Sequence, residues 1–202
     1  MVKPPGWLVH PTEVPVEGDL VLMKVLRDQI GARVYSIHRL DRPTSGLVLF
    51  GIDREVSKKL HAALERHEFE KVYHAVVCGV PDEKNWECRD PIRKEEGKPE
   101  RDAHTSFQLL DSWEKSGEIF SLVEAVPHTG RFHQIRRHLL SVGFPIVGDY
   151  RYGGIEWCDR LGEVLGSGNR MLLRAVRLSF LHPVTEERLD LSTDFTISGN
   201  SY

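Results

Sequence analysis

The segment His38-Arg39-Leu40-Asp41-Arg42-Pro43-Thr44-Ser45-Gly46 is a polar interruption between two apolar stretches, and it determines where the chain turns. Residues 47–50, which follow it, form an apolar run that is too short for a helix and predicts a buried strand. Pro43 fixes its own φ angle, and Gly46 has no side chain, so another group can approach its backbone closely. We therefore expect a tight, restricted turn that leads directly into a strand.

The chemically notable group of this turn is the carboxylate of Asp41. It stands between Arg39 and Arg42 in the sequence, and positive charges nearby favour the ionised form of a carboxylate. An ionised carboxylate on a rigid turn is available for catalysis. A surface turn with exposed ion pairs would have the same composition, so these residues alone leave both interpretations open.

The elements around the turn predict an α+β fold. Asp53 is expected to cap a helix whose apolar residues Val56, Leu60, Ala63 and Leu64 recur at helical spacing. The other expected elements are a helix near 133–141 that stops at Gly143, a glycine- and tyrosine-rich loop at 148–154, and strands at 34–37, 71–80, 105–110, 119–126, 171–180 and 188–191. Residues 81–102 are expected to form a solvated loop or hairpin. Because strands often follow one another directly, the sheet should be mixed and mainly antiparallel, with flanking helices.

Composition indicates one soluble, intracellular domain that spans residues 1–202. The chain has 27 basic and 30 acidic residues, a net charge of −3, with 40% hydrophobic and 28% charged residues. A chain of this length can bury a sizeable core without disulfide bonds. The three cysteines have no CxxC spacing and indicate reduced thiols, so we expect a cytoplasmic protein. No apolar run is long enough to span a membrane, and the first residues resemble neither a signal peptide nor an anchor.

A second polar cluster lies at residues 129–138. If this segment is helical, Phe132, Ile135 and Leu139 share one face and should pack inward. The polar positions of the cluster are Arg131, His133, Gln134, Arg136 and Arg137. Arginine pairs well with carboxylates and phosphates, so the cluster could hold an acidic group or an RNA backbone, although a solvated basic face is an equally ordinary explanation.

A third candidate is the pair Lys71 and Tyr73, which would point to the same side of a strand. A ring beside a cation can stack a nucleobase. A half-buried sheet tyrosine is the more common reason for such a residue.

Several familiar sites are absent from the sequence. It contains no GxxxxGK[ST] phosphate loop, no GxSxG motif and no HExxH motif. His128, His133 and His138 are spaced by five residues, so they do not align on one face of a helix, and polar contacts are favoured over metal ligation. We therefore predict no metal and no cofactor.

Taken together and in order, these motifs resemble those of RNA pseudouridine synthases of the RluA type. The matching stretches are Lys3-Pro4-Pro5-Gly6, residues 38–41 with 44–46, Lys71-Val72-Tyr73, residues 129–131 with 133–136 and 138–139, Pro145-Ile146-Val147-Gly148-Asp149, and His182-Pro183 with Thr185-Glu186. The resemblance spans nearly the whole chain, and HRLDxxTSG followed by TGRxHQIRxHL is a specific combination. Members usually carry a strand before the KPxG segment, so the first edge strand is expected to be missing here, and no S4-type module is recognised.

The resemblance implies a central RNA-binding cleft and a set of roles. Asp41 would be the catalytic carboxylate, Tyr73 would stack on the flipped uracil, and Arg136 would pair with Asp41. The resemblance and the basic side chains of these motifs also imply RNA contacts by Arg39, Arg42, Lys71, Arg131, His133, Gln134, Arg137 and Arg151.

The same resemblance implies the substrate class. Arg42-Pro43 and the opening residues 6–10 are most similar to members that act on tRNA, which would make the target a T-stem uridine at nucleotide 65. An rRNA substrate and a non-catalytic RNA-binding protein are the alternatives. A glycosidase-like hydrolase would need a second catalytic carboxylate, and no spacing here nominates one. We expect a monomer.

Overall fold

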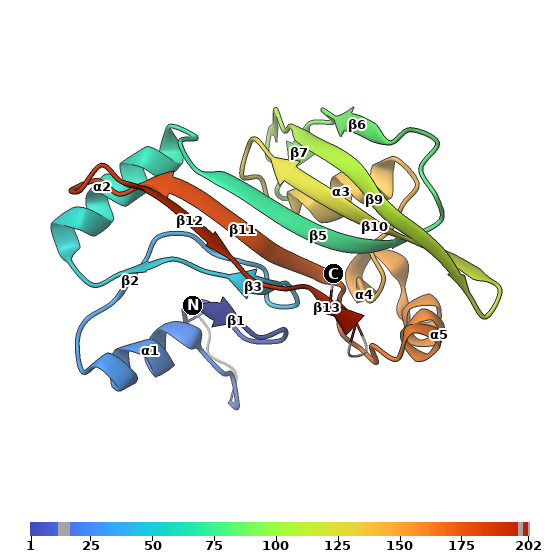
Figure 1. The fold of residues 1–202 in the computed structure, drawn as a ribbon, viewed down its shortest axis with the longest axis horizontal. Coiled ribbons are helices and arrows are strands. Elements are labelled where there is room, and N and C mark those ends of the chain that lie inside the picture. Colours follow the sequence, from blue (N-terminus) through green and yellow to red (C-terminus); the bar gives the residue numbers. More distant parts are fainter. Residues whose placement is uncertain (12–16, 198–199, 202) are drawn as a thin grey trace. The chain divides into compact units, whose positions relative to one another are not determined.

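The computed structural model describes residues 1–11, 17–197 and 200–201, and these divide into two compact units. The first unit contains residues 1–70 and 175–193, and the second contains residues 71–174 and 194–202. Figure 1 shows the elements of both units coloured along the sequence.

In its described residues, the first unit is built on strands and two helices. Strand β1 (Val2–Lys3) pairs antiparallel with β3 (Ser45–Leu47), and β11 (Leu173–Leu181) pairs antiparallel with β12 (Arg188–Ser192). In sheet order these strands run β1-β3-β11, with β12 on β11. Strand β2 (Tyr35–Ser36) forms a separate antiparallel pair with β4 (Phe50–Gly51). Helix α1 (Leu22–Ile30) ends at Gly31, which adopts the left-handed conformation.

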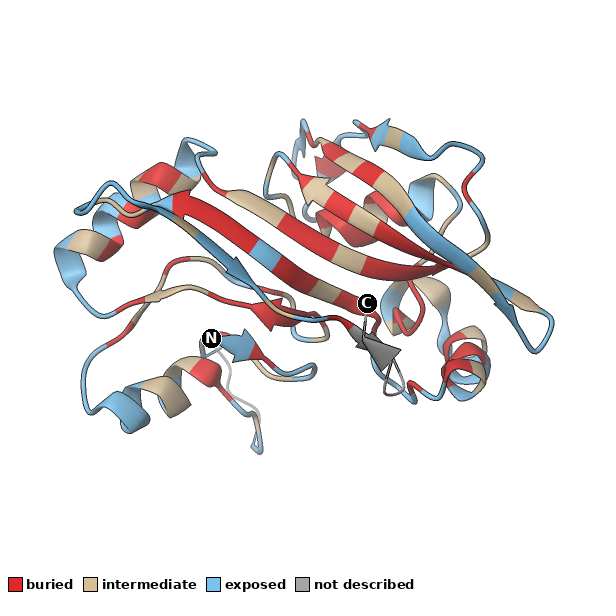
Figure 2. Ribbon diagram, viewed as in Figure 1, coloured by how far each residue is buried: buried red, intermediate tan, exposed pale blue. Residues whose placement is uncertain are grey.

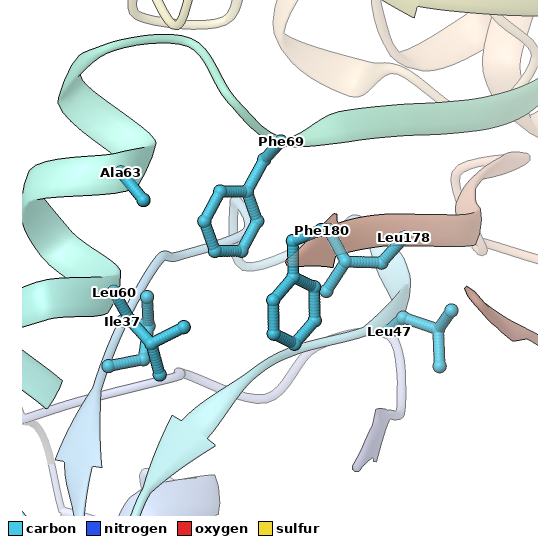
Figure 3. Close-up of a cluster of buried hydrophobic side chains, with 7 residues drawn as sticks. All are labelled: Ile37, Leu47, Leu60, Ala63, Phe69, Leu178 and Phe180. Atoms are coloured by element: carbon cyan, nitrogen blue, oxygen red, sulfur yellow. The ribbon is translucent and has the colours of Figure 1, made fainter. Parts of the chain in front are cut away.

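A hydrophobic core holds helix α2 (Arg54–Glu65) against the strands of the first unit. Figure 3 shows seven buried side chains that converge here, contributed by α2, by β3 and β11, and by the segments around residues 37 and 69: Ile37, Leu47, Leu60, Ala63, Phe69, Leu178 and Phe180. The rings of Phe69 and Phe180 stack with centroids 4.7 Å apart. The helix begins where expected, because Asp53 accepts a hydrogen bond of 2.8 Å from the backbone amide of Val56.

Over the residues that the structure describes, the second unit consists of an antiparallel sheet and three helices. Its strands are β5 (Glu70–Cys78), β6 (Asn85–Cys88), β9 (Thr105–Lys115) and β10 (Glu118–Pro127), in the order β5-β10-β9-β6. Figure 2 shows that β5 and β10 are mostly buried, whereas the β9–β10 turn end is exposed. Short pairs are formed by β7 (Ile92–Arg93) with β8 (Glu100–Arg101), and by β13 (Thr196–Ile197) with β14 (Asn200–Ser201). The helices are α3 (Gln134–Ser141), α4 (Tyr150–Gly153) and α5 (Ile155–Leu165).

The expected single strand over residues 47–50 is wrong in detail. The structure divides this run between β3 and β4, which pair with different partners. The division falls where the amide of Leu49 donates a hydrogen bond of 3.1 Å to Nε2 of His38, so that amide takes no part in a strand ladder. The segment 148–154, expected to be a loop, contains the single helical turn α4. The solvated loop or hairpin expected at 81–102 is confirmed in part: the segment contains the β7–β8 hairpin, but also strand β6, which pairs with β9 in the main sheet.

The close backbone approach predicted at Gly46 is confirmed: the backbone of Ala175 lies against it. The φ angle of Gly46 is +111°, and a Cβ atom built on it would lie 2.2 Å from the carbonyl oxygen of Ala175. The backbone of β11 therefore occupies the space that any side chain at residue 46 would need. This contact fixes the exit of the Asp41 turn against the sheet of the first unit.

We predict that Gly46→Ala destabilises the protein by at least about 2 kcal/mol more than Gly97→Ala, because overpacking adds to backbone strain. Gly97 is the matched control, since its φ angle is also positive (+78°) but no atom lies within 4 Å of the site of its Cβ. Urea unfolding followed by circular dichroism measures both changes. Equal unfolding midpoints for the two variants would contradict the steric argument.

Candidate active site

The Asp41 turn is held by backbone and side-chain hydrogen bonds from the N-terminal segment. The carbonyl oxygen of Arg42 accepts a bond of 2.9 Å from the amide of Gly6, and Nε of Arg42 returns a bond of 3.0 Å to the carbonyl of Gly6. Within the turn, the amide of Thr44 donates to the carbonyl of Asp41 over 3.1 Å. Asp41 itself is half-buried. The carboxylate is therefore carried by a backbone that is tied at both ends.

Beneath this turn lies a fully buried lysine. Lys3 has no exposed surface, and its Nζ donates to the carbonyl oxygens of Pro4 (2.9 Å), Trp7 (2.8 Å) and Arg42 (2.9 Å). Three carbonyls thus match the three N–H donors of an ammonium group. Burial lowers the pKa of Lys3 to about 8, while the nearby carboxylate of Asp41 opposes this change. Lys3 therefore joins the N-terminal turn at residues 4–7 to the Asp41 turn.

The two arginines that flank Asp41 in the sequence are exposed. The guanidinium of Arg42 lies 3.1 Å from Asp19, in addition to its bond to Gly6. Arg42 therefore ties the turn to neighbouring segments of its own unit. An RNA contact by Arg39 or Arg42 stays a prediction.

Tyr73 lies within β5, where its backbone pairs opposite Ala125 of β10. Tyr73 is buried, with 9% of its surface exposed. Burial lowers the pKa of Lys71, two residues earlier on the same strand. The structure thus confirms the strand that carries this pair, while a stacking role for Tyr73 stays a prediction.

The loop before α3 is organised by Gln134. Its Oε1 accepts from the hydroxyl of Thr129 (2.7 Å) and from the amide of Arg131 (2.9 Å). Its Nε2 donates over 2.9 Å both to the carbonyl of His104 and to the hydroxyl of Thr105. All four bonding positions of this buried amide are used within the protein. We assign Gln134 to holding the loop, and do not retain the expected direct contact with RNA.

Arg136 is buried and forms a fork with the buried carboxylate of Asp149. Its Nε donates to Oδ2 and its Nη2 to Oδ1, each over 2.7 Å, and the two side chains are 4% and 3% exposed. The centre of the guanidinium also lies 5.1 Å from the ring centroid of Tyr152. A guanidinium has five N–H donors, so Asp149 uses two of them. The implied pairing of Arg136 with Asp41 stays a proposal.

The expectation that Phe132 packs inward with Ile135 and Leu139 is wrong for Phe132. Helix α3 begins at Gln134, and His133 before it adopts a left-handed backbone conformation with φ of +55°. Phe132 therefore lies outside the helical spacing, half-buried, with its ring stacked on that of His133 at 3.7 Å. Ile135 and Leu139 are buried as expected.

The other predicted RNA contacts of this cluster also bond within the protein. Nδ1 of His133 lies 3.0 Å from the hydroxyl of Tyr152. Nε of Arg131 donates to the carbonyl of Asp102 (2.9 Å), and Nη1 of Arg137 donates to that of Arg93 (2.6 Å). These bonds attach the β7–β8 segment and Asp102 to the loop before α3 and to the middle of α3. Both arginine side chains are half-buried, so RNA contacts by them stay predictions.

The histidines contact polar groups of the protein. His138 is buried, with Nδ1 2.9 Å from the hydroxyl of Thr105 and Nε2 3.0 Å from the carbonyl of Asp90. Burial lowers the pKa of His138, which favours the neutral ring. Over the part of the chain that the structure describes, no three or more His, Cys, Asp or Glu side chains are arranged to hold a metal ion. None of the described helices is both long and apolar enough to cross a bilayer.

Sequence reasoning assigned no role to Lys3 or Asp149. Both lie in motifs on which the family resemblance is based, but the sequence does not distinguish a buried charged side chain from an exposed one at these positions. A signal does exist for Asp149, because it directly follows an apolar run and a glycine, the pattern of a residue at a buried turn. Lys3 has no comparable signal, since its partners are backbone carbonyls.

The comparisons with known proteins agree on one family. Residues 1–141 match the family described as RNA pseudouridylate synthase. A tRNA pseudouridine synthase C from Pectobacterium carotovorum is 38% identical over 94% of this chain and 54% of its own length. Proteins of the same name from Salmonella typhi and Haemophilus ducreyi are 37% and 38% identical, and this chain covers 78% and 84% of them. The chain thus spans about half of the first relative and most of the other two.

Solved structures agree on the fold. Human RNA pseudouridylate synthase domain containing 1 superposes with a TM-score of 0.72 at 24% identity, over 93% of this chain and 82% of that protein. Human RNA pseudouridylate synthase domain containing 4 gives the same TM-score over 96% and 84%. The predicted α+β fold with its mainly antiparallel pairing is confirmed.

We predict that Lys3→Met destabilises the protein by about 2–4 kcal/mol at pH 7, because the carbonyls of Pro4, Trp7 and Arg42 lose the ammonium that donates to them. The difference from wild type should grow by about 2 kcal/mol between pH 7.5 and 9.5. In this range the unfolded chain, with an ordinary lysine pKa, still binds the proton that the folded chain has lost, so Lys3 adds stability as pH rises. Urea unfolding of both proteins across this range measures the difference.

Lys24→Met is the control for the loss of a lysine, since Lys24 lies on the exposed side of α1. It should change stability by less than about 0.5 kcal/mol at every pH. A Lys3→Met protein as stable as wild type would show that the hydrogen bonds of Lys3 to the two turns are not needed for stability.

Proposed function

The chain belongs to the RNA pseudouridylate synthase family, and we propose that it converts a tRNA uridine to pseudouridine with Asp41 as its catalytic carboxylate. It is an isomerase that acts on RNA. The observation that carries the assignment of Asp41 is its place on a turn tied to Gly6 and Lys3, beside a buried ammonium. A carboxylate held so firmly is preorganised to meet charge that develops on a substrate.

The reaction requires a carboxylate at the sugar. The bond between N1 of uracil and C1′ breaks, the base turns, and C5 bonds to C1′. C5 then loses its proton and N1 gains one. Breaking the glycosidic bond develops positive character at C1′, which an ionised carboxylate stabilises or traps. Asp41 either attacks C1′ or removes a ribose proton, and both routes need its ionised form close to the sugar.

Two further residues complete the proposed chemistry. Tyr73 receives the extruded uracil on its ring, since a base inside a stack is out of reach of protein side chains. Arg136 stabilises the charge of Asp41. Their own surroundings support this: Tyr73 is held in strand β5, paired with β10, and Arg136 is held by Asp149.

Binding of the RNA backbone is assigned to basic side chains. These are Arg39, Arg42, Lys71, Arg131, Arg137 and Arg151, together with His133. Local positive charge can bind phosphates although the chain as a whole carries a net charge of −3. The part of Gln134 is indirect, through the loop that carries Arg131.

Transfer RNA is the proposed substrate because the relatives named above are called tRNA pseudouridine synthase C. Within tRNA, we propose the T-stem uridine at nucleotide 65. The proposed state is a cytoplasmic monomer.

We predict that Asp41→Asn lowers pseudouridine formation at least about 1,000-fold while the Kd for RNA changes less than about threefold. The carboxylate is required by the chemistry, whereas phosphate contacts supply most of the affinity. Tritium release from RNA labelled at C5 of uridine measures turnover, and filter binding measures the Kd. Asp53→Asn, at the cap of α2, is the control for an Asp-to-Asn change away from the turn and should retain full activity.

An Asp41→Asn variant with wild-type turnover would remove Asp41 from the mechanism. A wild-type protein that binds tRNA without modifying it would instead favour the non-catalytic alternative.

We further predict that deletion of the gene removes one pseudouridine from the T-stem of tRNA. Mapping of pseudouridine in total tRNA and rRNA, with and without the gene, measures this at nucleotide resolution. Loss of an rRNA site with tRNA unchanged would overturn the proposed substrate and leave the enzyme class intact.

A further inference from the structure

Arg136 and Asp149 form a buried ion pair with two parallel hydrogen bonds. Both charges are almost fully buried, and two parallel bonds of 2.7 Å join them. We propose that Asp149 is a positioning residue that fixes the guanidinium of Arg136 for the reaction. This inference rests on the proposed function, in which Arg136 acts on the catalytic carboxylate.

Asp149 is itself held by its backbone. Gly148 before it has a φ angle of +77°, and a Cβ there would lie 2.1 Å from the carbonyl of Arg170, so only glycine fits. Val147 forms bonds of 2.9 Å to Val76 of β5 and to Leu172. After the turn, the carbonyl of Asp149 accepts from the amides of Tyr152 (3.1 Å) and Gly153 (2.8 Å), the last two residues of α4. The carboxylate therefore projects from a segment that is hydrogen-bonded to strand β5 and to Leu172.

A second contact holds the guanidinium from its face. The ring of Tyr152, three residues after Asp149, lies 5.1 Å from the centre of the Arg136 guanidinium. The hydroxyl of Tyr152 lies 3.0 Å from Nδ1 of His133, which precedes α3. The contacts thus form a closed ring from α3 to α4 and back to α3. The guanidinium has little freedom to rotate within it.

Stability alone is a weak explanation for this pair. Replacing a buried ion pair by apolar residues is often neutral or stabilising, because burying two charges costs several kcal/mol. What the pair provides is a fixed orientation of a planar, permanently charged group. Misplacement of a catalytic group by about 1 Å can lower a rate about 100-fold.

The test is a double-mutant cycle on turnover with Asp149→Asn, Arg136→Met and the double variant. Because Asp149 acts through Arg136, Asp149→Asn should lower kcat at least 10-fold and change the Kd for tRNA less than threefold. In the Arg136→Met background the same change should lower kcat less than twofold. Asp159→Asn is the control, since the exposed Asp159 bonds to the Tyr150 hydroxyl rather than to Arg136, and it should leave kcat unchanged.

The outcomes separate the inference from its premise. Wild-type kcat in Arg136→Met would overturn the catalytic part of Arg136, and this inference with it. A lowered kcat in Arg136→Met together with a wild-type kcat in Asp149→Asn would overturn the inference alone. So would a double variant in which Asp149→Asn lowers kcat as much as it does when Arg136 is present. If Asp149→Asn fails to fold, Tyr152→Leu replaces it in the cycle, because it removes the face contact and keeps both charges; it should lower kcat at least threefold, but only when Arg136 is present.

Discussion

The first unit depends on one buried ammonium group. Lys3 joins three carbonyls, from Pro4, Trp7 and Arg42, that belong to two segments about forty residues apart in the chain. Without that donor the carbonyls of Pro4 and Trp7 would lose this hydrogen bond, while the carbonyl of Arg42 would keep the amide of Gly6. An unsatisfied buried polar group costs about 1–3 kcal/mol. The lysine therefore forces the N-terminal turn and the Asp41 turn to fold together. The pairing of β1 with β3 and the contact of Gly46 with Ala175 act on the same turn from its other end.

The second unit uses the same principle with side chains in place of carbonyls. Helix α3 buries three polar residues, Gln134, Arg136 and His138, in addition to Ile135 and Leu139. Each of the three is bonded to groups outside the helix: Gln134 to the preceding loop and β9, Arg136 to Asp149, and His138 to Thr105 and Asp90. Buried polar networks that are fully satisfied specify a single arrangement, whereas an apolar face allows several. The helix is thus fixed in rotation as well as in place.

Local patterns in the sequence predicted the elements that depend on local chemistry. The capping of α2 by Asp53, the strands that became β5 and β10, and the end of α3 before Gly143 follow from spacing and turn residues. The division of residues 47–50 between β3 and β4 did not follow, because it depends on His38 and on partner strands distant in the chain. Phe132 was misplaced because the left-handed conformation of His133 starts α3 later than the apolar spacing indicates. The roles of Lys3 and Asp149 depend on tertiary contacts that no spacing reveals.

The difference between Arg42 and Arg136 shows why charge near a candidate acid is a poor guide by itself. Both were singled out from the sequence as partners of a carboxylate or of RNA. Arg42 is exposed and ties the turn to Gly6 and Asp19, so water screens its charge and its side chain keeps alternative partners. Arg136 is buried, where an interaction between charges is stronger and a wrong orientation is harder to relax. A group of this kind can serve catalysis only if something else orients it beforehand, and in this structure Asp149 and Tyr152 are in position to do so.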